Sequence, residues 1–254
     1  MTDRLLVLLR ADDAEPDRLA RALGLAPAEA LQRVRRGGWQ LLRIAAPAVA
    51  EPEAARLTGE GLAAVLVPEA EARIASRPRL ALGGDMAGGT LTLRTSEGMV
   101  GVERRDLLLV VQGPIAREYQ TSPQVKRTRT ATLEGGYRFH LHRRTGPPPV
   151  ELDPWSFAFS RAGPGSSSLL QLAAWVQELS AGAEVDDNFR RLPAELGVAE
   201  PGGGGPLAAA NALSVGSGAR QRGPLLLDNL GQFRFYSAWR GAVERRRRDG
   251  HARS

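Results

Sequence analysis

The first 77 residues alternate short apolar runs with segments that have helical spacing of apolar residues. Three apolar runs are typical of buried strands, at 4–9, 39–45 and 62–67. Three amphipathic segments begin at a proline, which fits the first turn of a helix, and end at glycine. These prolines are Pro16, Pro27 and Pro52. The pattern predicts the order strand, helix, helix, strand, helix, strand over residues 1–77.

This order resembles a fold shared by two families, over residues 1–70. Similarity to the C-terminal domain of the bacterial ribosomal stalk protein rests on Leu23-Gly24-Leu25, Glu29-Ala30, Val34, Glu53-Ala54 and Gly61. Similarity to the Clp protease adaptor rests on Ala11-Asp12-Asp13, Pro16 and Pro68-Glu69. The segment lacks the lysines of the stalk protein's factor-binding helices and the histidine of the adaptor's substrate pocket. The resemblance therefore implies the fold and neither function.

Residues 79–160 change to the period-2 alternation of β-strands. The segments 90–95 and 137–143 alternate strictly, and glycine or proline turns separate them from other short apolar runs. We therefore expect antiparallel strands at hairpin spacing. Ser166–Ser168 can then cap a helix with one apolar stripe, made of Leu172, Trp175, Val176 and Leu179. In layout alone, residues 79–180 resemble the pleckstrin-homology fold.

The C-terminal part divides into a glycine-rich segment and an aromatic tail. Glycines and alanines over 200–224 predict a linker. Residues 225–254 are expected to form one helix, which ends in Arg245–Arg248. The chain is thus predicted to be α+β, with a βααβαβ module at 1–77 and an antiparallel β module with a sealing helix at 79–199. We expect residues 1–77 to fold independently of 79–180, with Pro78 at the junction.

Composition excludes several classes of chemistry. The chain has no cysteine, which rules out disulfides, thiolate catalysis and cysteine-ligated zinc or iron–sulfur clusters. No apolar run approaches the roughly 18–20 residues of a membrane span. The N-terminal apolar run at 4–9 has acidic flanks, which a secretion signal would not have. We therefore expect a cytoplasmic protein without a transmembrane segment.

The net charge of +6 is concentrated in two segments. Residues 117–144 carry seven basic and two acidic side chains, and 219–254 carry nine and three, whereas 145–218 carry three and eight. Lys126 is the sole lysine among 34 basic residues, which is typical of a GC-rich genome and need not reflect selection for binding. Two patches separated by an acidic segment favour nucleic-acid binding only weakly.

Two histidines form the main candidate for chemistry. His140 and His142 lie two residues apart on a predicted strand, so both project from one face. With Glu151 or Asp153 they could complete a metal site or serve a hydrolytic enzyme. Because arginines share their face, a bound cation is disfavoured, and we predict no metal and no cofactor.

The same face can instead be a basic surface for the phosphate or carboxylate groups of a partner. The residues assigned to it are Arg138, His140, His142 and Arg144, extended by Lys126, Arg127 and Arg129. The simplest alternative is a solvated sheet face without a partner. No Gly-x-Ser-x-Gly elbow and no phosphate-binding loop occurs, and Asp186-Asp187 is interpreted as a cap or turn.

The aromatic tail is expected to pack back onto the body, because its four large rings would otherwise expose an apolar patch. These residues are Phe233, Phe235, Tyr236 and Trp239. Arg245–Arg248 would then stay in water near the acidic segment 145–218.

Together the patterns predict a non-catalytic binding or adaptor protein that engages an acidic protein or other anionic partner, with the N-terminal module as a second contact surface. The alternatives are a hydrolytic or metal-dependent enzyme that uses His140 and His142, and a nucleic-acid or ribosome-associated factor. The oligomeric state is not predicted.

Overall fold

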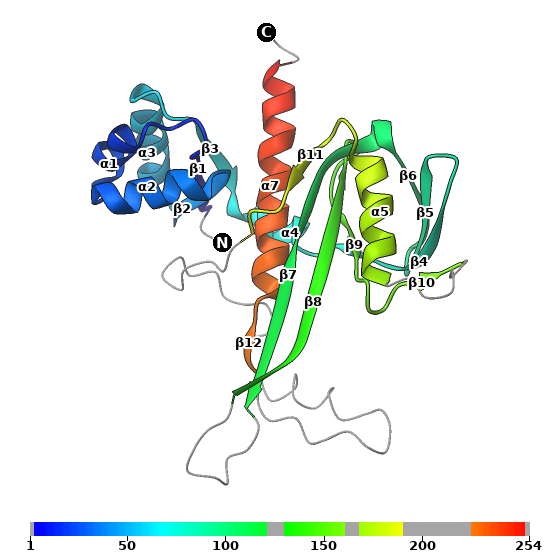
Figure 1. Cartoon of the computed structure of the whole chain (residues 1–254). Helices are drawn as coiled ribbons and strands as arrows, with labels where there is room; N and C mark the ends of the chain where they lie inside the picture. The colour runs from blue at the N-terminus through cyan, green and yellow to red at the C-terminus, as the bar shows by residue number, and fades with distance from the viewer. Residues whose placement is uncertain (1–2, 121–129, 161–167, 190–224, 252–254) are drawn as a thin grey trace.

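The computed structural model describes residues 3–120, 130–160, 168–189 and 225–251, and the fold is α+β (Figure 1). The linker expected at 200–224 lies outside these residues. Within the described part, no helix combines the length and apolar character needed to cross a membrane.

The N-terminal module has the predicted order of elements. They are β1 (Leu5–Arg10), α1 (Pro16–Leu23), α2 (Pro27–Arg36), β2 (Trp39–Ala45), α3 (Pro47–Gly59) and β3 (Ala64–Pro68), followed by α4 (Glu69–Ala75). The third helix begins at Pro47 and not at Pro52, which lies inside it. Pro47 follows an extended residue and occupies the first turn, where its missing N–H costs nothing.

The three strands of this module form an antiparallel sheet of order β2-β1-β3, and both of its faces are buried. Val7 and Leu9 of β1 pack in the core that helices α1 and α3 cover. Leu6 and Leu8, which project from the opposite face, belong to a different core. This explains why β1 is a continuous apolar run and does not alternate.

The second module is built on a nine-stranded sheet of order β11-β7-β8-β9-β4-β5-β6, with β10 beside β4 and β12 beside β7. Its strands are β4 (Arg79–Ala87), β5 (Thr90–Thr95), β6 (Gly98–Glu103), β7 (Leu107–Gln120), β8 (Thr130–Arg143), β9 (Val150–Leu152), β10 (Ala158–Phe159), β11 (Glu184–Asp186) and β12 (Leu225–Asp228). A short 3₁₀ helix, η1 (Arg104–Asp106), joins β6 to β7.

The sequence predicted an antiparallel sheet, but the sheet of the structure is mixed. β9 is antiparallel to β8 but parallel to β4, and β10 and β11 pair parallel with β4 and β7. Each parallel pair joins strands that are far apart in the sequence, so hairpin spacing could not predict the direction of pairing. The predicted sealing helix is present as α5 (Ser168–Ser180), which buries Leu172, Val176 and Leu179.

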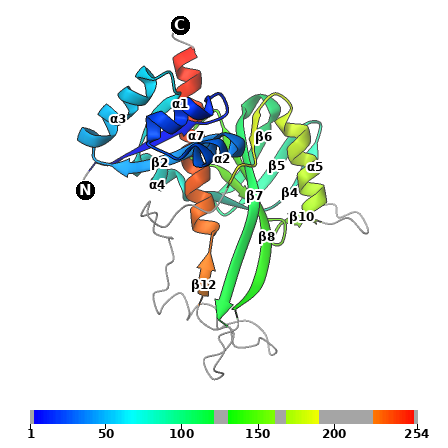
Figure 2. The same ribbon diagram turned by 60° about the vertical axis from the view of Figure 1, so that its left-hand side comes forward.

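Strands β7 and β8 form a long hairpin arm. Each has 14 residues, and the two pair antiparallel over their full length. The far half of the hairpin extends past the body together with β12 (Figures 1 and 2). We use "arm" for this projecting part, which comprises Pro114–Gln120, Thr130–Tyr137 and β12.

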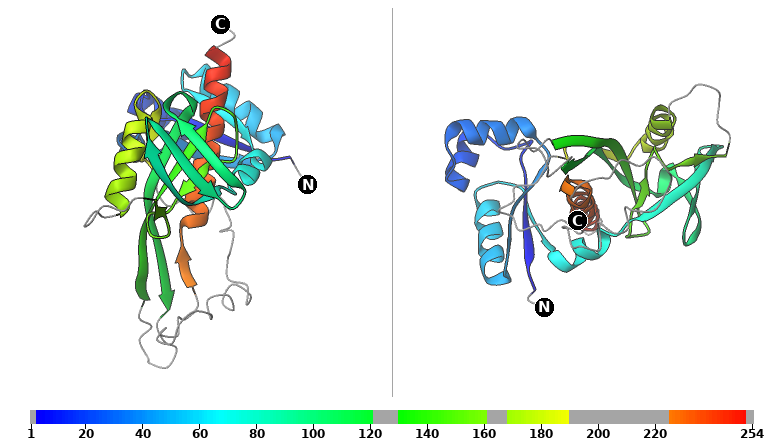
Figure 3. Two further views of the ribbon diagram at one scale, coloured as in Figure 1. Left: turned by 90° about the vertical axis from the view of Figure 1, so that its right-hand side faces the viewer. Right: turned by 90° about the horizontal axis from the view of Figure 1, so that it is seen from below.

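The C-terminal segment is a strand followed by a helix, and not one helix. Residues 225–228 pair with β7 as β12, and α7 (Leu230–His251) then continues through the arginine run. Helix α7 lies between the two sheets (Figure 3). One core therefore contains residues of β1, β2 and β3, of β7 and of α7. Whether residues 1–77 fold alone stays a prediction, but their outer sheet face is covered by another part of the chain.

Candidate functional site

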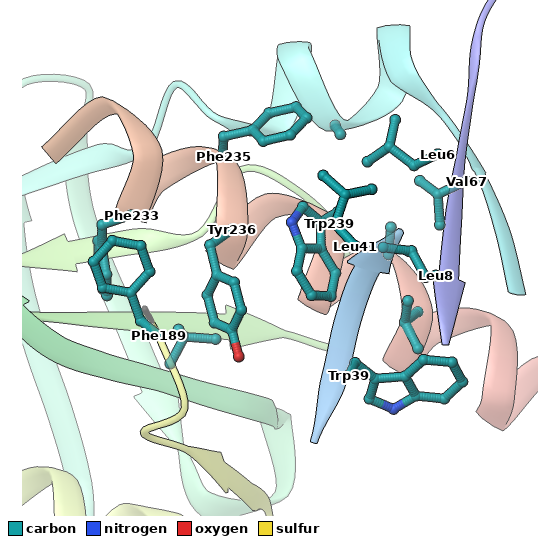
Figure 4. Packing of buried hydrophobic residues seen from close by; sticks show 14 of the residues in the cluster. Leu6, Leu8, Trp39, Leu41, Val67, Phe189, Phe233, Phe235, Tyr236 and Trp239 are labelled. Atoms are coloured by element: carbon teal, nitrogen blue, oxygen red, sulfur yellow. The ribbon is translucent and has the colours of Figure 1, made fainter. Parts of the chain in front are cut away.

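Helix α7 is the central element of the molecule. Phe233, Phe235, Tyr236 and Trp239 are each at most 3% exposed, and they point to different neighbours (Figure 4). Trp239 faces the N-terminal sheet, whereas Phe233 and Tyr236 pack against Phe189, with ring centroids 5.3 and 5.6 Å apart. Arg73 of α4 lies 4.8 Å above the ring of Phe235. The tail residues are thus packed within this chain, on several sides of the helix.

A polar network joins α7 to the sheet at the two histidines. Ser237 Oγ lies 2.8 Å from His140 Nδ1 and 2.7 Å from His142 Nε2. On its other side, His140 Nε2 lies 3.0 Å from Glu151 Oε2 on β9. Each of these four side chains is at most 2% exposed. The network therefore lies in the interior, between α7 and β8.

With both imidazoles neutral, the hydrogen bonds fit together in one direction only. Glu151 is held as a carboxylate, so His140 Nε2–H donates to it and Nδ1 is left as an acceptor. The Ser237 hydroxyl then donates to His140 Nδ1 and accepts from His142 Nε2–H. Both imidazoles are neutral in this arrangement. Burial lowers the pKa of His140 and lowers that of His142 well below its ordinary value, where the nearby charges act in the same direction.

Glu151 is the anionic centre of this network. Burial by itself raises its pKa, but hydrogen bonds from Arg234 and His140 outweigh burial and hold the pKa far below its ordinary value. Arg234 of α7 donates twice, from Nε at 2.7 Å and from Nη2 at 2.8 Å. Arg138 binds Asp153 at 2.8 Å and lies 3.7 Å from Glu151. Each buried charge here has an opposite charge beside it.

A second cluster fixes the other side of α7. Arg240 binds Asp186 through Nε and Glu184 at 2.7 Å through Nη2. The Tyr236 hydroxyl donates to Asp186 at 2.8 Å, and burial with this carboxylate raises the pKa of Tyr236. Asp186 is thus a buried member of β11. Its carboxylate also accepts a hydrogen bond at 2.9 Å from the N–H of Asn188, two residues on, which agrees with its interpretation as a turn residue. Sequence spacing could not place an arginine 54 residues away beside it.

The expected basic surface on β8 does not exist as an exposed face. Arg138, His140 and His142 do share one face, but α7 covers it, and all three side chains are buried. Arg144 alone is exposed, and its Nε donates to the carbonyl of Arg105. The expectation failed because alternation separates the two faces of a strand without showing what covers each. Lys126, Arg127 and Arg129 lie outside the described residues.

The carboxylate, imidazole and hydroxyl of Glu151, His140 and Ser237 follow the same order as the groups of a hydrolytic triad. A nucleophile needs an open position where a substrate carbon can approach, and both Ser237 and His140 are fully buried. Ser237 also uses its hydroxyl in two hydrogen bonds to imidazoles. In this geometry the network can hold α7 in place, but it presents no reactive atom to solvent.

Possible metal sites and surface hollows were compared with the position of this network. Among the described residues, no three histidine or carboxylate side chains gather as a metal site. A hollow of about 890 Å³ lies beside Arg4, Glu69, Arg73 and Ile74, and one of about 320 Å³ lies over β4, β5 and β10. Neither is lined by a network residue.

Sequence analysis missed the partners that α7 supplies. Arg234, Ser237 and Gly241 lie three and four residues apart, so they share one face of the helix. The small residues on this face let the helix approach the sheet closely, and a Cβ at Gly241 would lie 2.6 Å from Cε1 of His142. A stripe of small and polar residues in an otherwise aromatic helix was the pattern that could have indicated this contact.

Comparisons with protein-family models, with curated proteins and with solved structures found no match to this chain.

Proposed function

We propose that this protein is a non-catalytic binding protein that engages an acidic protein or other anionic partner through its arm. The observation that carries the proposal is the projection of β7 and β8 beyond the body (Figure 1). In the sequence, the segment 121–129 that connects them carries Lys126, Arg127 and Arg129 and no acidic residue. An extended element that leads to a segment with three basic and no acidic residues suits recognition of carboxylate or phosphate groups.

The closed state of the histidine network supports binding over catalysis. The alternative of a hydrolytic enzyme is favoured by one observation, the hydrogen-bonded chain from Glu151 through His140 to Ser237. All three groups are buried and saturated, so α7 would have to leave before a substrate could reach them. Its departure would remove Ser237 itself. Labelling of Ser237 by a fluorophosphonate in the native protein would favour the enzyme.

The arrangement of the second basic segment supports a protein partner over nucleic acid. Arg234 and Arg240 are used in internal ion pairs with Glu151 and Asp186. Arg246 binds Glu71 at 2.6 Å, and Arg247 binds Glu184 at 3.1 Å. Much of the positive charge of α7 is thus compensated within the chain. A nucleic-acid surface requires several free cations along one face.

The proposal is tested by charge reversal in the segment 121–129, which connects the two strands of the arm, and this variant is called the arm variant. The triple variant Lys126→Glu, Arg127→Glu, Arg129→Glu should elute from a heparin column at lower salt than the natural protein. It should also lose binding to a poly-glutamate peptide. A matched control reverses Arg21, Arg35 and Arg36, which are exposed on α1 and α2 and change the net charge by the same amount.

The comparison between the two triple variants decides the outcome. Selective loss in the arm variant, with unchanged melting temperature, supports the arm as the binding element. Equal loss in both variants means that only the net charge matters, and full binding by the arm variant contradicts the proposal directly.

A further inference from the structure

Strand β6 is the terminal strand of the large sheet, and among the described residues no strand pairs with its outer edge. An open edge presents unpaired backbone N–H and C=O groups, which can pair with another strand. Soluble proteins usually protect such edges with charges or proline. Between Gly98 and Val102, β6 has neither, and Gly98, Met99 and Gly101 are exposed. This edge is therefore competent to accept a strand.

The residues at the two ends of β6 carry opposite charges. Glu97 precedes the strand and is 60% exposed, whereas Arg105 follows it and is 80% exposed. An antiparallel copy of the same strand would bring Glu97 of each copy near Arg105 of the other. The same complementary contact would then form twice, as a two-fold axis requires.

We propose that β6 pairs antiparallel with β6 of a second copy of this chain, about a two-fold axis at Gly101. Such an axis is perpendicular to the sheet, so it pairs residues that lie on the same face. Paired residue numbers within β6 must therefore have an even sum, and the axis at Gly101 sets Met99 opposite Glu103 and Val100 opposite Val102. Beyond the paired residues, Glu97 in the turn before β6 then lies near Arg105 in η1 of the second copy. Gly101 carries no side chain, so no side chain of either copy crowds the axis on that face of the sheet.

This register also matches the side chains along the strand. Val102 is buried in the core under α5, and Val100 packs against that core. In the dimer Val100 lies opposite Val102 of the second copy, so the apolar face continues across the axis. On the other face, Met99, which is 65% exposed, lies beside Glu103 of the second copy. One face of the joined strands is thus buried and apolar in both copies, and the other face is exposed in both.

The charged residues already have weak partners within the chain. Glu97 binds Arg79 at 2.8 Å and Arg105 binds Glu103 at 2.9 Å. Glu97 and Arg105 are largely exposed to solvent, whereas Arg79 and Glu103 are partly buried. Exposed pairs contribute little, so sharing them with a second copy costs little. Because a six-residue strand buries less area than a standard interface, we expect a dissociation constant of about 1–100 µM.

The test is sedimentation analysis from about 1 to 300 µM, a range that brackets this constant. The natural protein should dimerise, and Glu97→Arg or Arg105→Glu should each be monomeric over the same range, because like charges then meet twice. A mixture of the two variants should dimerise again, since each arginine at 97 then faces a glutamate at 105. Glu60→Arg, at the exposed residue that follows α3, is the control of equal charge and should dimerise normally.

Three results would overturn the proposal. One is a natural protein that stays monomeric over the whole range, and this holds even if the protein binds an extended peptide at this edge. Another is a dimer that neither charge reversal weakens. The third is a pair of weakened variants whose mixture does not recover. The arm is not involved in any of these measurements, so failure here leaves the proposed function separately testable.

Discussion

Replacing Gly241 with alanine tests the close packing between α7 and β8. A Cβ at this position would overlap Nδ1 of His142 and lie 2.6 Å from Cε1 of the same ring. The ring has little freedom to move, because it is 2% exposed and its Nε2 is held at 2.7 Å from Ser237 Oγ. The added methyl group must therefore displace either the imidazole or the helix.

Two effects of opposite sign compete in this variant. Alanine is favoured over glycine inside a helix by about 0.5–1 kcal/mol. An extra methyl group in a filled core costs about 1–3 kcal/mol, and loss of the His142 hydrogen bond adds about 1 kcal/mol. The clash is the larger effect. We expect the free energy of unfolding to fall by about 1–3 kcal/mol.

Urea unfolding followed by circular dichroism measures this change, and Gly59→Ala is the matched control. Gly59 is the last residue of α3 and has no atom within 4 Å of its Cβ position. Alanine there should leave the free energy of unfolding unchanged or raise it by up to about 1 kcal/mol. If Gly241→Ala raises stability as well, the contact between α7 and His142 is not as close as the reasoning requires.

Two further predictions concern the histidines and the N-terminal module. Burial lowers the pKa values of His140 and His142, so below about pH 6.5 the unfolded chain binds protons before the folded one does. The free energy of unfolding should then fall as the pH decreases, by up to about 1.4 kcal/mol per pH unit for each histidine. Urea unfolding at several pH values measures it, and a free energy that does not change below about pH 6.5 would contradict the prediction. Residues 1–77 alone should be marginally stable and should gain thermal stability when a peptide of residues 230–251 is added, because Leu6 and Leu8 pack in the core that α7 completes. A cooperative melt that the peptide leaves unchanged would show that the module does not need α7.

Local elements were predictable where the pattern is local. Proline at the first turn and glycine at the end identified α1 and α2, and the apolar stripe of α5 identified its buried face. The alternation of β8 correctly separated two sets of side chains, one of which contains Phe139 and Leu141. Nothing in that alternation shows that the other set is also covered. The covering residue Ser237 lies 97 positions from His140.

The conformation of residues 225–227 was unpredictable for a related reason. Leu225–Leu227 is apolar and precedes an aromatic helix, so propensity alone extends the helix backwards. In the structure these residues pair with the edge of β7. The open edge of a strand that ends more than a hundred residues earlier decides their conformation, and that information is tertiary.

The polar contacts of α7 explain how a helix buried on several sides keeps a single position. Apolar packing alone is tolerant, because one aromatic ring can replace another if the helix slides by a turn. Arg234 and Ser237 meet Glu151 and the histidines on one side, whereas Arg240 meets Asp186 on another. A shift of one turn would leave these buried groups without partners, at a cost of about 1–3 kcal/mol for each neutral group and more for each charge. The histidines therefore act as positioning groups that fix the register of the helix shared by the two modules.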